Sequence, residues 1–193
     1  PHTPPVAPQP DGMEICMRAG HVGARVSNTA TASGQVISNN GLSSYKGNTI
    51  TANNAALTGI AIEAGSGAIF NNKLAFFTNT ATGISTLPGI NGITTYDGAF
   101  NVYNNSIKFG NSSFSNGVKI YGINNKSTSP NNYFHNSISI SGNATGAAAR
   151  SDAFIRIHTG DLLLKNNLFS NTRTCTGHHY AVSNLVSTQI EQA

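Results

Sequence analysis

The chain has 193 residues, of which 38% are hydrophobic and only 9% are charged, and its formal net charge is +4. This length suffices for one domain with a sizeable core, whereas globular proteins usually have about 25% charged residues. The lysines stand singly and no run of 18 apolar residues occurs, so the sequence gives little support to nucleic-acid binding and predicts no transmembrane segment. Branched and aromatic residues recur throughout, which indicates a folded chain.

The first 35 residues differ in composition from the rest of the chain. Residues 1–12 carry five prolines and are expected to form a stiff, extended arm or linker. Residues 13–35 are expected to form an N-terminal cap or an irregular first coil, and residues 36–193 the main fold. The chain begins without a methionine or a signal peptide, so we expect a processed product or a portion of a longer protein.

From residue 36 onward the sequence repeats with a period of about 32 residues. Each copy contains two adjacent asparagines, and the second members of successive pairs are 31 to 33 positions apart. These second members are Asn40, Asn72, Asn105, Asn136 and Asn167, with His135 replacing the first asparagine of one pair. An apolar residue follows two positions later in each copy, and we expect these residues to form one inward row of the core: Leu42, Leu74, Ile107, Ile138 and Phe169.

The expected elements between the turns are short strands. Alternating apolar runs follow the asparagines and also lie between them, covering in chain order residues 60–62, 74–76, 107–109, 118–120, 138–140, 155–157 and 180–182. Alternation with a period of two predicts strands with one buried face. Turn formers at residues 110–113 and 141–143 separate these runs, and no segment has the sustained periodicity of a long helix.

A repeat of this length with short strands and no helix predicts a right-handed parallel β-helix of about five coils. Ankyrin and tetratricopeptide repeats have similar periods but need two helices each, and the strict hexapeptide pattern of the left-handed form is absent. Each residue of a solenoid lies above its counterpart in the previous coil, so stacked asparagine side chains are expected to hydrogen-bond along the axis as a ladder. The alternative is that each pair is an independent surface turn.

Most of the chain also resembles a known group of repeats. Residues 131–140 place asparagines before an aromatic residue and an Asn-Ser strand, and residues 165–173 and 177–182 read KNNLFSNTR and GHHYAV. In this order the segments resemble the β-helix repeats of very large secreted surface proteins of Bacteroidetes-type bacteria, over residues 36–184. The resemblance implies an exported, extracellular or cell-surface β-helix and carries no marker of a particular activity.

Polysaccharide lyases and hydrolases are the enzymatic alternative, because such sites need clustered carboxylates. No two adjacent coils place acids at the same register; the acids are Asp11, Glu14, Glu63, Asp97, Asp152, Asp161 and Glu191. Asp152 and Asp161 flank one strand, an arrangement that fits either cation binding or solvated loops. We therefore expect no catalytic residues and no cofactor.

Histidines and outward strand residues are two further candidate sites. His135, His158, His178 and His179 carry metal-binding side chains, but adjacent strand residues point to opposite faces, so we expect packing or hydrogen bonding and no metal site. A glycan-binding face is the alternative function, with glycans as partners. Its expected outward residues are Lys108, Lys119, Tyr121, Arg156 and His158.

Cys16 and Cys175 are the only cysteines, and five coils would separate them by about 20 Å, beyond the reach of a disulfide. Either the N-terminal segment runs back along the solenoid to Cys175, or Cys16 of one subunit meets Cys175 of the next.

The ends of a solenoid expose unpaired strand edges, and residues 183–193 are too few to form a substantial cap. We expect a secreted, non-catalytic structural protein that stacks end to end into filaments or continues into further coils of the same polypeptide.

Overall fold

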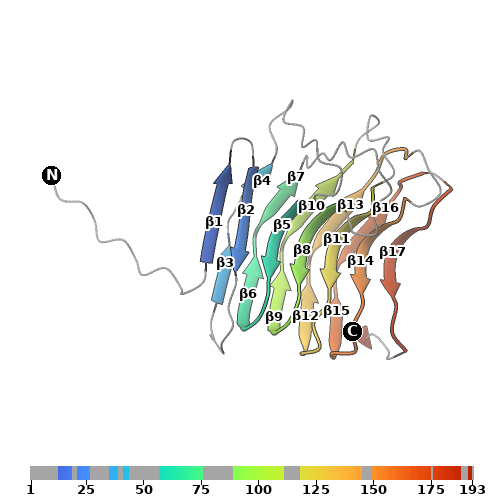
Figure 1. Cartoon of the computed structure of the whole chain (residues 1–193). Coiled ribbons are helices and arrows are strands. Elements are labelled where there is room, and N and C mark those ends of the chain that lie inside the picture. The colour runs from blue at the N-terminus through green and yellow to red at the C-terminus, as the bar shows by residue number, and fades with distance from the viewer. Residues whose placement is uncertain are drawn as a thin grey trace.

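The computed structural model describes residues 13–18, 21–26, 35–38, 41–43, 57–75, 89–110, 118–144, 149–174, 176–187 and 191–192, with side chains from residue 58 to residue 187 of these ranges. These residues form an all-β solenoid in which strands stack along one axis (Figure 1). The chain visits three sheets in rotation, so each sheet gains one strand per turn. The described residues contain no helix, and hence none that could cross a membrane.

Each sheet is named here by its number of strands. The seven-stranded sheet contains β1 (Met13–Arg18), β2 (His21–Val26), β5 (Leu57–Ile62), β8 (Ile90–Thr95), β11 (Ile120–Asn125), β14 (Ser151–Arg156) and β17 (His179–Asn184). The six-stranded sheet contains β3 (Gln35–Ser38), β6 (Ser66–Phe70), β9 (Ala99–Tyr103), β12 (Asn131–Phe134), β15 (Leu162–Lys165) and β18 (Glu191–Gln192). The five-stranded sheet contains β4 (Gly41–Ser43), β7 (Lys73–Ala75), β10 (Ser106–Phe109), β13 (Ser137–Ile140) and β16 (Leu168–Asn171).

The strand pairs of all three sheets are parallel except for one. β1 and β2 form an antiparallel hairpin, and β1 is the N-terminal edge of the seven-stranded sheet. The expected cap at residues 13–35 includes this hairpin, and its capping role stays a prediction. The expected arm at residues 1–12 lies outside the described residues.

Between Asn72 and Asn167 the solenoid makes about three turns with a repeat of about 31 residues, so the expectation of about five coils is overstated. Each asparagine pair marks one corner, and a complete turn runs from one pair to the next. Five pairs therefore define only four turns. The first marker, Asn40, lies outside the described residues. The intervals between Asn72 and Asn167 correspond to three turns.

The core is built from residues that alternate along each strand and repeat in register from turn to turn. Ile60, Ile93, Ile123, Phe154 and Val182 align across the seven-stranded sheet and face the interior. Of the expected inward row, Leu74, Ile107 and Ile138 are buried, and Phe169 is half-buried against the core. The side chain of Leu42 lies outside the described residues. The period of two therefore identified the buried face of the five-stranded sheet.

Candidate functional site

Each turn has a sharp corner immediately before the five-stranded sheet. The corner residue has a positive φ, which is 57° at Asn71, 53° at Asn104, 52° at His135 and 54° at Asn166. Asparagine and histidine are enriched in this left-handed conformation, which most side chains avoid. Backbone geometry therefore explains the first member of each asparagine pair, including the copy in which histidine replaces it.

The second members of the pairs form an asparagine ladder, made of Asn72, Asn105, Asn136 and Asn167. Asn105 Oδ1 accepts hydrogen bonds from the backbone amide and Nδ2 of Asn72, at 3.1 and 2.9 Å. Asn136 Oδ1 accepts the same two bonds from Asn105, at 3.1 and 3.0 Å. Asn167 Oδ1 accepts them from Asn136, at 2.9 and 3.0 Å. The side chain of each asparagine thus links two turns.

The second proton on each ladder amide is also used. Nδ2 of Asn105 donates to the carbonyl of Ile69 at 2.9 Å, and Nδ2 of Asn136 donates to the carbonyl of Val102 at 2.8 Å. Asn72, Asn105 and Asn136 are each about 1% exposed. A buried amide whose two donor hydrogens and acceptor oxygen are all hydrogen-bonded stabilises the fold. Removing the side chain of one ladder asparagine leaves several buried groups unpaired, and each unpaired group lowers the free energy of unfolding by about 1–3 kcal/mol.

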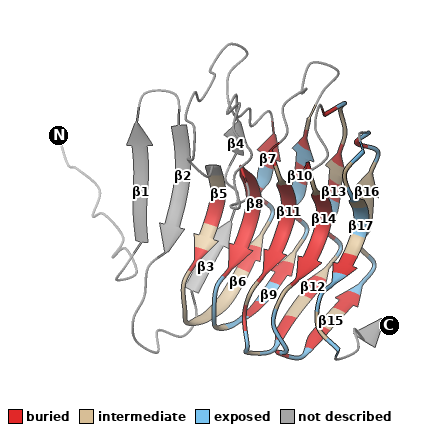
Figure 2. Ribbon diagram, turned by 45° about the vertical axis from the view of Figure 1, so that its right-hand side comes forward, coloured by how far each residue is buried: buried red, intermediate tan, exposed pale blue. Residues whose placement is uncertain are grey.

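At the C-terminal end of the solenoid, terminal strands lie beside exposed apolar side chains. β16 and β17 are the last strands of the five- and seven-stranded sheets. Leu168 is 66% exposed, Leu185 53% and Tyr180 41%, and these are three of the four exposed large hydrophobic residues in the described part of the chain. We call the strands β16 and β17, which are labelled in Figure 2, together with Leu185 the C-terminal face. Among the described residues no further asparagine follows Asn167 in the ladder.

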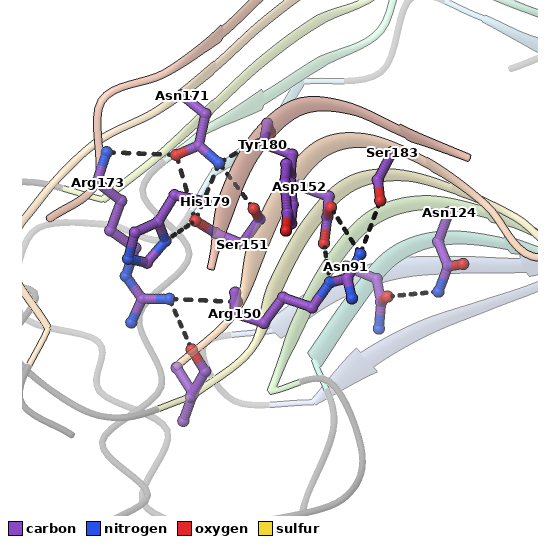
Figure 3. Close-up of polar contacts among 11 residues, drawn as sticks. Asn91, Asn124, Arg150, Ser151, Asp152, Asn171, Arg173, His179, Tyr180 and Ser183 are labelled. Carbon is purple, nitrogen blue, oxygen red and sulfur yellow. Dashed lines mark hydrogen bonds and ion pairs between the residues drawn. The ribbon is translucent and has the colours of Figure 1, made fainter. Parts of the chain in front are cut away.

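On the outer side of the seven-stranded sheet, Arg150 joins the last two strands (Figure 3). Its Nε and Nη2 donate to the two carboxylate oxygens of Asp152 at 2.7 and 3.1 Å. Nη2 also donates to Ser183 Oγ on β17 at 2.7 Å. The guanidinium carbon lies 5.4 Å from the centre of the Tyr180 ring, a cation–π contact on the same strand. Arg150 therefore connects β14 to β17 through three side chains.

On the inner side, a second polar cluster holds the same two strands. Ser151 Oγ lies 2.7 Å from His179 Nδ1. Asn171 Nδ2 donates to the carbonyl of Ser151 at 2.8 Å and to the carbonyl of Tyr180 at 3.0 Å. Nη1 of the buried Arg173 donates to the carbonyl of Val118 at 2.7 Å and reaches the carbonyl of Arg150 at 3.5 Å. Arg173 thus contacts from inside the segments that lead into β11 and β14, which belong to two successive turns.

Burial is the largest cause of the pKa shifts of Asp152 in the outer cluster and of His179 in the inner cluster. It raises the pKa of the fully buried Asp152 carboxyl, against the opposing hydrogen bond and charge of Arg150. The hydrogen bond to Asp152 raises the pKa of the Arg150 guanidinium. Burial, followed by the charge of Arg173, lowers the pKa of the His179 imidazole, which favours its neutral form. Ser151 has no exposed surface, so a substrate cannot reach its hydroxyl in this conformation.

The expected glycan-binding face is not one exposed surface. Tyr121 and Arg156 are buried and Lys119 is half-buried, so of the five expected residues only Lys108, on β10, and His158, after β14, are exposed. Arg156 faces inward, where Nε donates to the carbonyl of His158 at 3.0 Å and Nη2 donates to the carbonyl of Gly160. The alternation of Ile155 and Ile157 suggested the opposite orientation, but Phe154 sets the inward phase by packing against Tyr133 and Phe169.

The remaining candidate residues are not brought together. His178 stacks on Tyr180, with ring centres 6.1 Å apart, while His179 contacts Ser151. Asp152 is buried against Arg150, and Asp161 is exposed. The described residues include no group of three or more potential metal-ligating side chains. Cys175 and the side chain of Cys16 lie outside the described residues, so the expected disulfide stays a prediction.

Sequence reasoning missed the residues that hold β17, namely Arg150, Arg173, Asn171 and Ser183. An available signal was the position of the two arginines, since each lies just before or after a strand in a chain with very few charged residues. A comparison with family models, curated proteins and solved structures finds no match for this chain.

Proposed function

We propose that this chain is a secreted, non-catalytic structural protein of the cell surface or extracellular matrix that assembles end to end through its C-terminal face. The observation that carries this proposal is that two terminal strands, to which no further strand of the described residues is paired, lie at the same end as three exposed apolar side chains. Exposed edges template further strand pairing, and an adjacent apolar area adds a driving force for association.

A second copy is the partner that fits this face best. Stacked in the same axial direction, the next copy would present β3 and β4 to β18 and β16 as parallel strands, and β1 to β17 as an antiparallel strand. Such a contact is heterologous and repeats without closing, so it yields filaments. Further coils of the same polypeptide would satisfy the same edges. We also propose right-handed winding, since parallel crossover connections are right-handed in about 98% of cases.

Sedimentation velocity and negative-stain electron microscopy of the purified chain test this proposal. We expect concentration-dependent oligomers or filaments that Leu168→Glu and Leu185→Glu disperse, because each places a charge on the C-terminal face. Tyr96→Glu is the matched control: Tyr96 is the fourth exposed large hydrophobic residue and lies outside this face. Monomers at every concentration, or equal dispersal by the control variant, would contradict end-to-end assembly.

The cysteines provide a second test. If Cys16 of one subunit meets Cys175 of the next, a non-reducing gel of the assembled material will show a series of multimers that collapses on reduction, and Cys175→Ser will abolish the series. A single band that shifts on reduction would instead indicate an internal disulfide.

A further inference from the structure

The outer face of the six-stranded sheet carries a strip of aromatic and amide side chains. The inward residues Ile69, Val102 and Tyr133 are fully buried on β6, β9 and β12, so the residues beside them face outward. In register along the axis, one outward row contains Phe70, Tyr103 and Phe134, and the neighbouring row contains Asn101 and Asn132. We call these five residues the aromatic–amide strip. They lie along β6, β9 and β12, which are side by side in Figures 1 and 2.

The aromatic row is accessible to a ligand. Phe70, Tyr103 and Phe134 are all half-buried, so part of each side chain remains at the surface. The Phe70 and Tyr103 rings are parallel, with an interplanar angle of 0°, and their centres are 4.9 Å apart. Planes in van der Waals contact are about 3.5–4.0 Å apart, so a 4.9 Å separation of the centres means that the rings are offset. Part of each ring face is therefore left uncovered by its neighbour.

The amide row supplies hydrogen-bonding groups beside these rings. Asn132 Nδ2 donates to Asn101 Oδ1 at 2.9 Å, and this bond lies at the surface. An amide has two donor hydrogens and an acceptor oxygen. One bond therefore leaves Nδ2 of Asn101 and Oδ1 of Asn132 able to donate to and accept from a ligand. The bond itself fixes both side chains beside the aromatic row.

The chemistry of the strip selects a class of ligand. The five residues carry no charge, and the adjoining charge is Lys165, which follows Phe134 in register on β15. Uncharged donors and acceptors beside partly accessible rings match a pyranose, which has apolar ring faces and a rim of hydroxyls. The strip repeats with the strand spacing of about 4.8 Å along the axis, which suits an extended polymer more than a small molecule. We propose that the aromatic–amide strip binds a neutral, extended polysaccharide that runs along the solenoid axis.

The other described outward faces do not offer this combination. The outer face of the five-stranded sheet carries Lys73, Lys108 and serines, with no aromatic residue on β7, β10 or β13 that is exposed. The outer face of the seven-stranded sheet is buried along β8, β11 and β14. The strip is also remote in sequence from Leu168 and Leu185, so polysaccharide binding and end-to-end assembly can be tested separately.

Depletion assays on microcrystalline cellulose and on chitin, with affinity electrophoresis in gels containing a soluble neutral β-glucan, test the proposal. The assays are run at high salt, because the net charge of +4 would otherwise favour non-specific adsorption. We expect the unaltered chain to bind at least one of these probes. Tyr103→Ser should weaken binding about tenfold, which corresponds to the loss of one aromatic contact of about 1.4 kcal/mol.

Two further variants keep the test decisive if Tyr103→Ser is poorly folded. Asn101→Asp changes one amide to a carboxylate at an exposed position and should weaken binding several-fold without a change in thermal midpoint. Tyr96→Ser removes an exposed tyrosine outside the strip and should bind normally.

Failure of the chain to bind any of the three neutral probes would overturn the proposal, as would equal binding by the Tyr103→Ser, Asn101→Asp and control variants. If Tyr103→Ser instead changes the oligomeric state while no probe binds, the strip contacts a second copy and the polysaccharide assignment is wrong. Dispersal of filaments by Leu168→Glu with unchanged polysaccharide binding would separate the two surfaces.

Discussion

The middle turns and the C-terminal turn of this solenoid are stabilised by different interactions, although the backbone repeats in register. One inward row of the seven-stranded sheet reads Ile90 and Ile120 in the middle turns and Ser151 and His179 in the last two. A second inward row changes from Ile62, through Thr95 and Asn125, to the buried Arg156. These two rows are therefore more apolar in the middle turns and more polar in the last turns, where hydrogen bonds and an ion pair add to the packing.

This difference shows that a solenoid backbone does not require a uniform core. Main-chain hydrogen bonds between turns are the same in both regions, so the side chains decide how each turn responds to pH, salt and substitution. Polar networks are directional and costly when they are incomplete, whereas apolar contacts tolerate small shifts. We expect the C-terminal turn to be the more sensitive region to solvent conditions, and the middle turns to be the more sensitive region to loss of volume.

The largest expected effect comes from the apolar row that crosses both regions. Phe154 is fully buried and contacts the rings of Tyr133 and Phe169. Phe154→Ala should lower the free energy of unfolding by about 3–5 kcal/mol, because it removes buried area and leaves a cavity. Urea denaturation followed by circular dichroism measures this. A loss below about 1 kcal/mol would mean that polar contacts stabilise this turn more than apolar packing does, and that Phe154 is not a main stabilising residue of the core.

The asparagine ladder is the feature that the two regions share, and its loss should rank second. Asn105→Ala removes the acceptor of two bonds from Asn72 and two donors, one to Ile69 and one to Asn136, all in a buried site. We expect a loss of about 3 kcal/mol in the free energy of unfolding. Asn101→Ala is the matched control, since Asn101 is exposed and should change stability by less than about 0.5 kcal/mol. Equal effects would argue against a stabilising ladder.

The ladder and the apolar row are examples of features that can be predicted from the sequence. Period-two alternation and the asparagine spacing predict the parallel solenoid, the buried positions Leu74, Ile107 and Ile138, and the corner that His135 can occupy. These features are local or repeat at a fixed interval, so one chain contains several copies of the signal. The number of turns was overestimated because markers were counted where intervals define turns.

The contacts of the C-terminal turn were not predictable in the same way. The sequence predicted that Arg156 points outward, because Ile155 and Ile157 flank it. The packing of Phe154 against Tyr133 instead determines which residues of β14 face inward, and Arg156 is one of them. Arg150, Asp152 and Ser183 occur in one copy of the repeat each, so periodicity carries no information about their contacts. The link from Arg150 to Ser183 depends on the register between β14 and β17, which aligns residues 28 positions apart, and a single sequence does not reveal that register.

The ion pair on the outer side tests how strongly the last strand depends on polar contacts. Arg150→Ala leaves the buried carboxylate of Asp152 without its partner and removes the link to Ser183. We expect a loss of about 2 kcal/mol, less than for a fully buried pair, since the Arg150 side chain is 24% exposed. The double variant Arg150→Ala/Asp152→Asn should recover part of this loss. No recovery would indicate that the cation–π and Ser183 contacts, and not the ion pair, hold β17.

The smallest expected effect is a pH dependence that only the C-terminal turn should show. The pKa of His179 is lowered in the folded chain by burial and by Arg173, while Asp152 opposes this shift and His178 adds to it. As the pH falls below the ordinary histidine pKa of about 6.5, the unfolded chain binds the proton first, so the free energy of unfolding decreases until the lowered pKa is passed.

Asp152 acts in the opposite direction and at lower pH, because its raised pKa lets the folded chain bind a proton before the unfolded chain does. Between neutral pH and about 5.5 the histidine should therefore dominate. Urea denaturation across this interval should show a decline that His179→Gln removes and that His158→Gln, at an exposed histidine, leaves unchanged. An identical decline in the unaltered chain and in both variants would mean that the titrating group lies outside the inner cluster. The middle and C-terminal turns would then not differ in their response to pH.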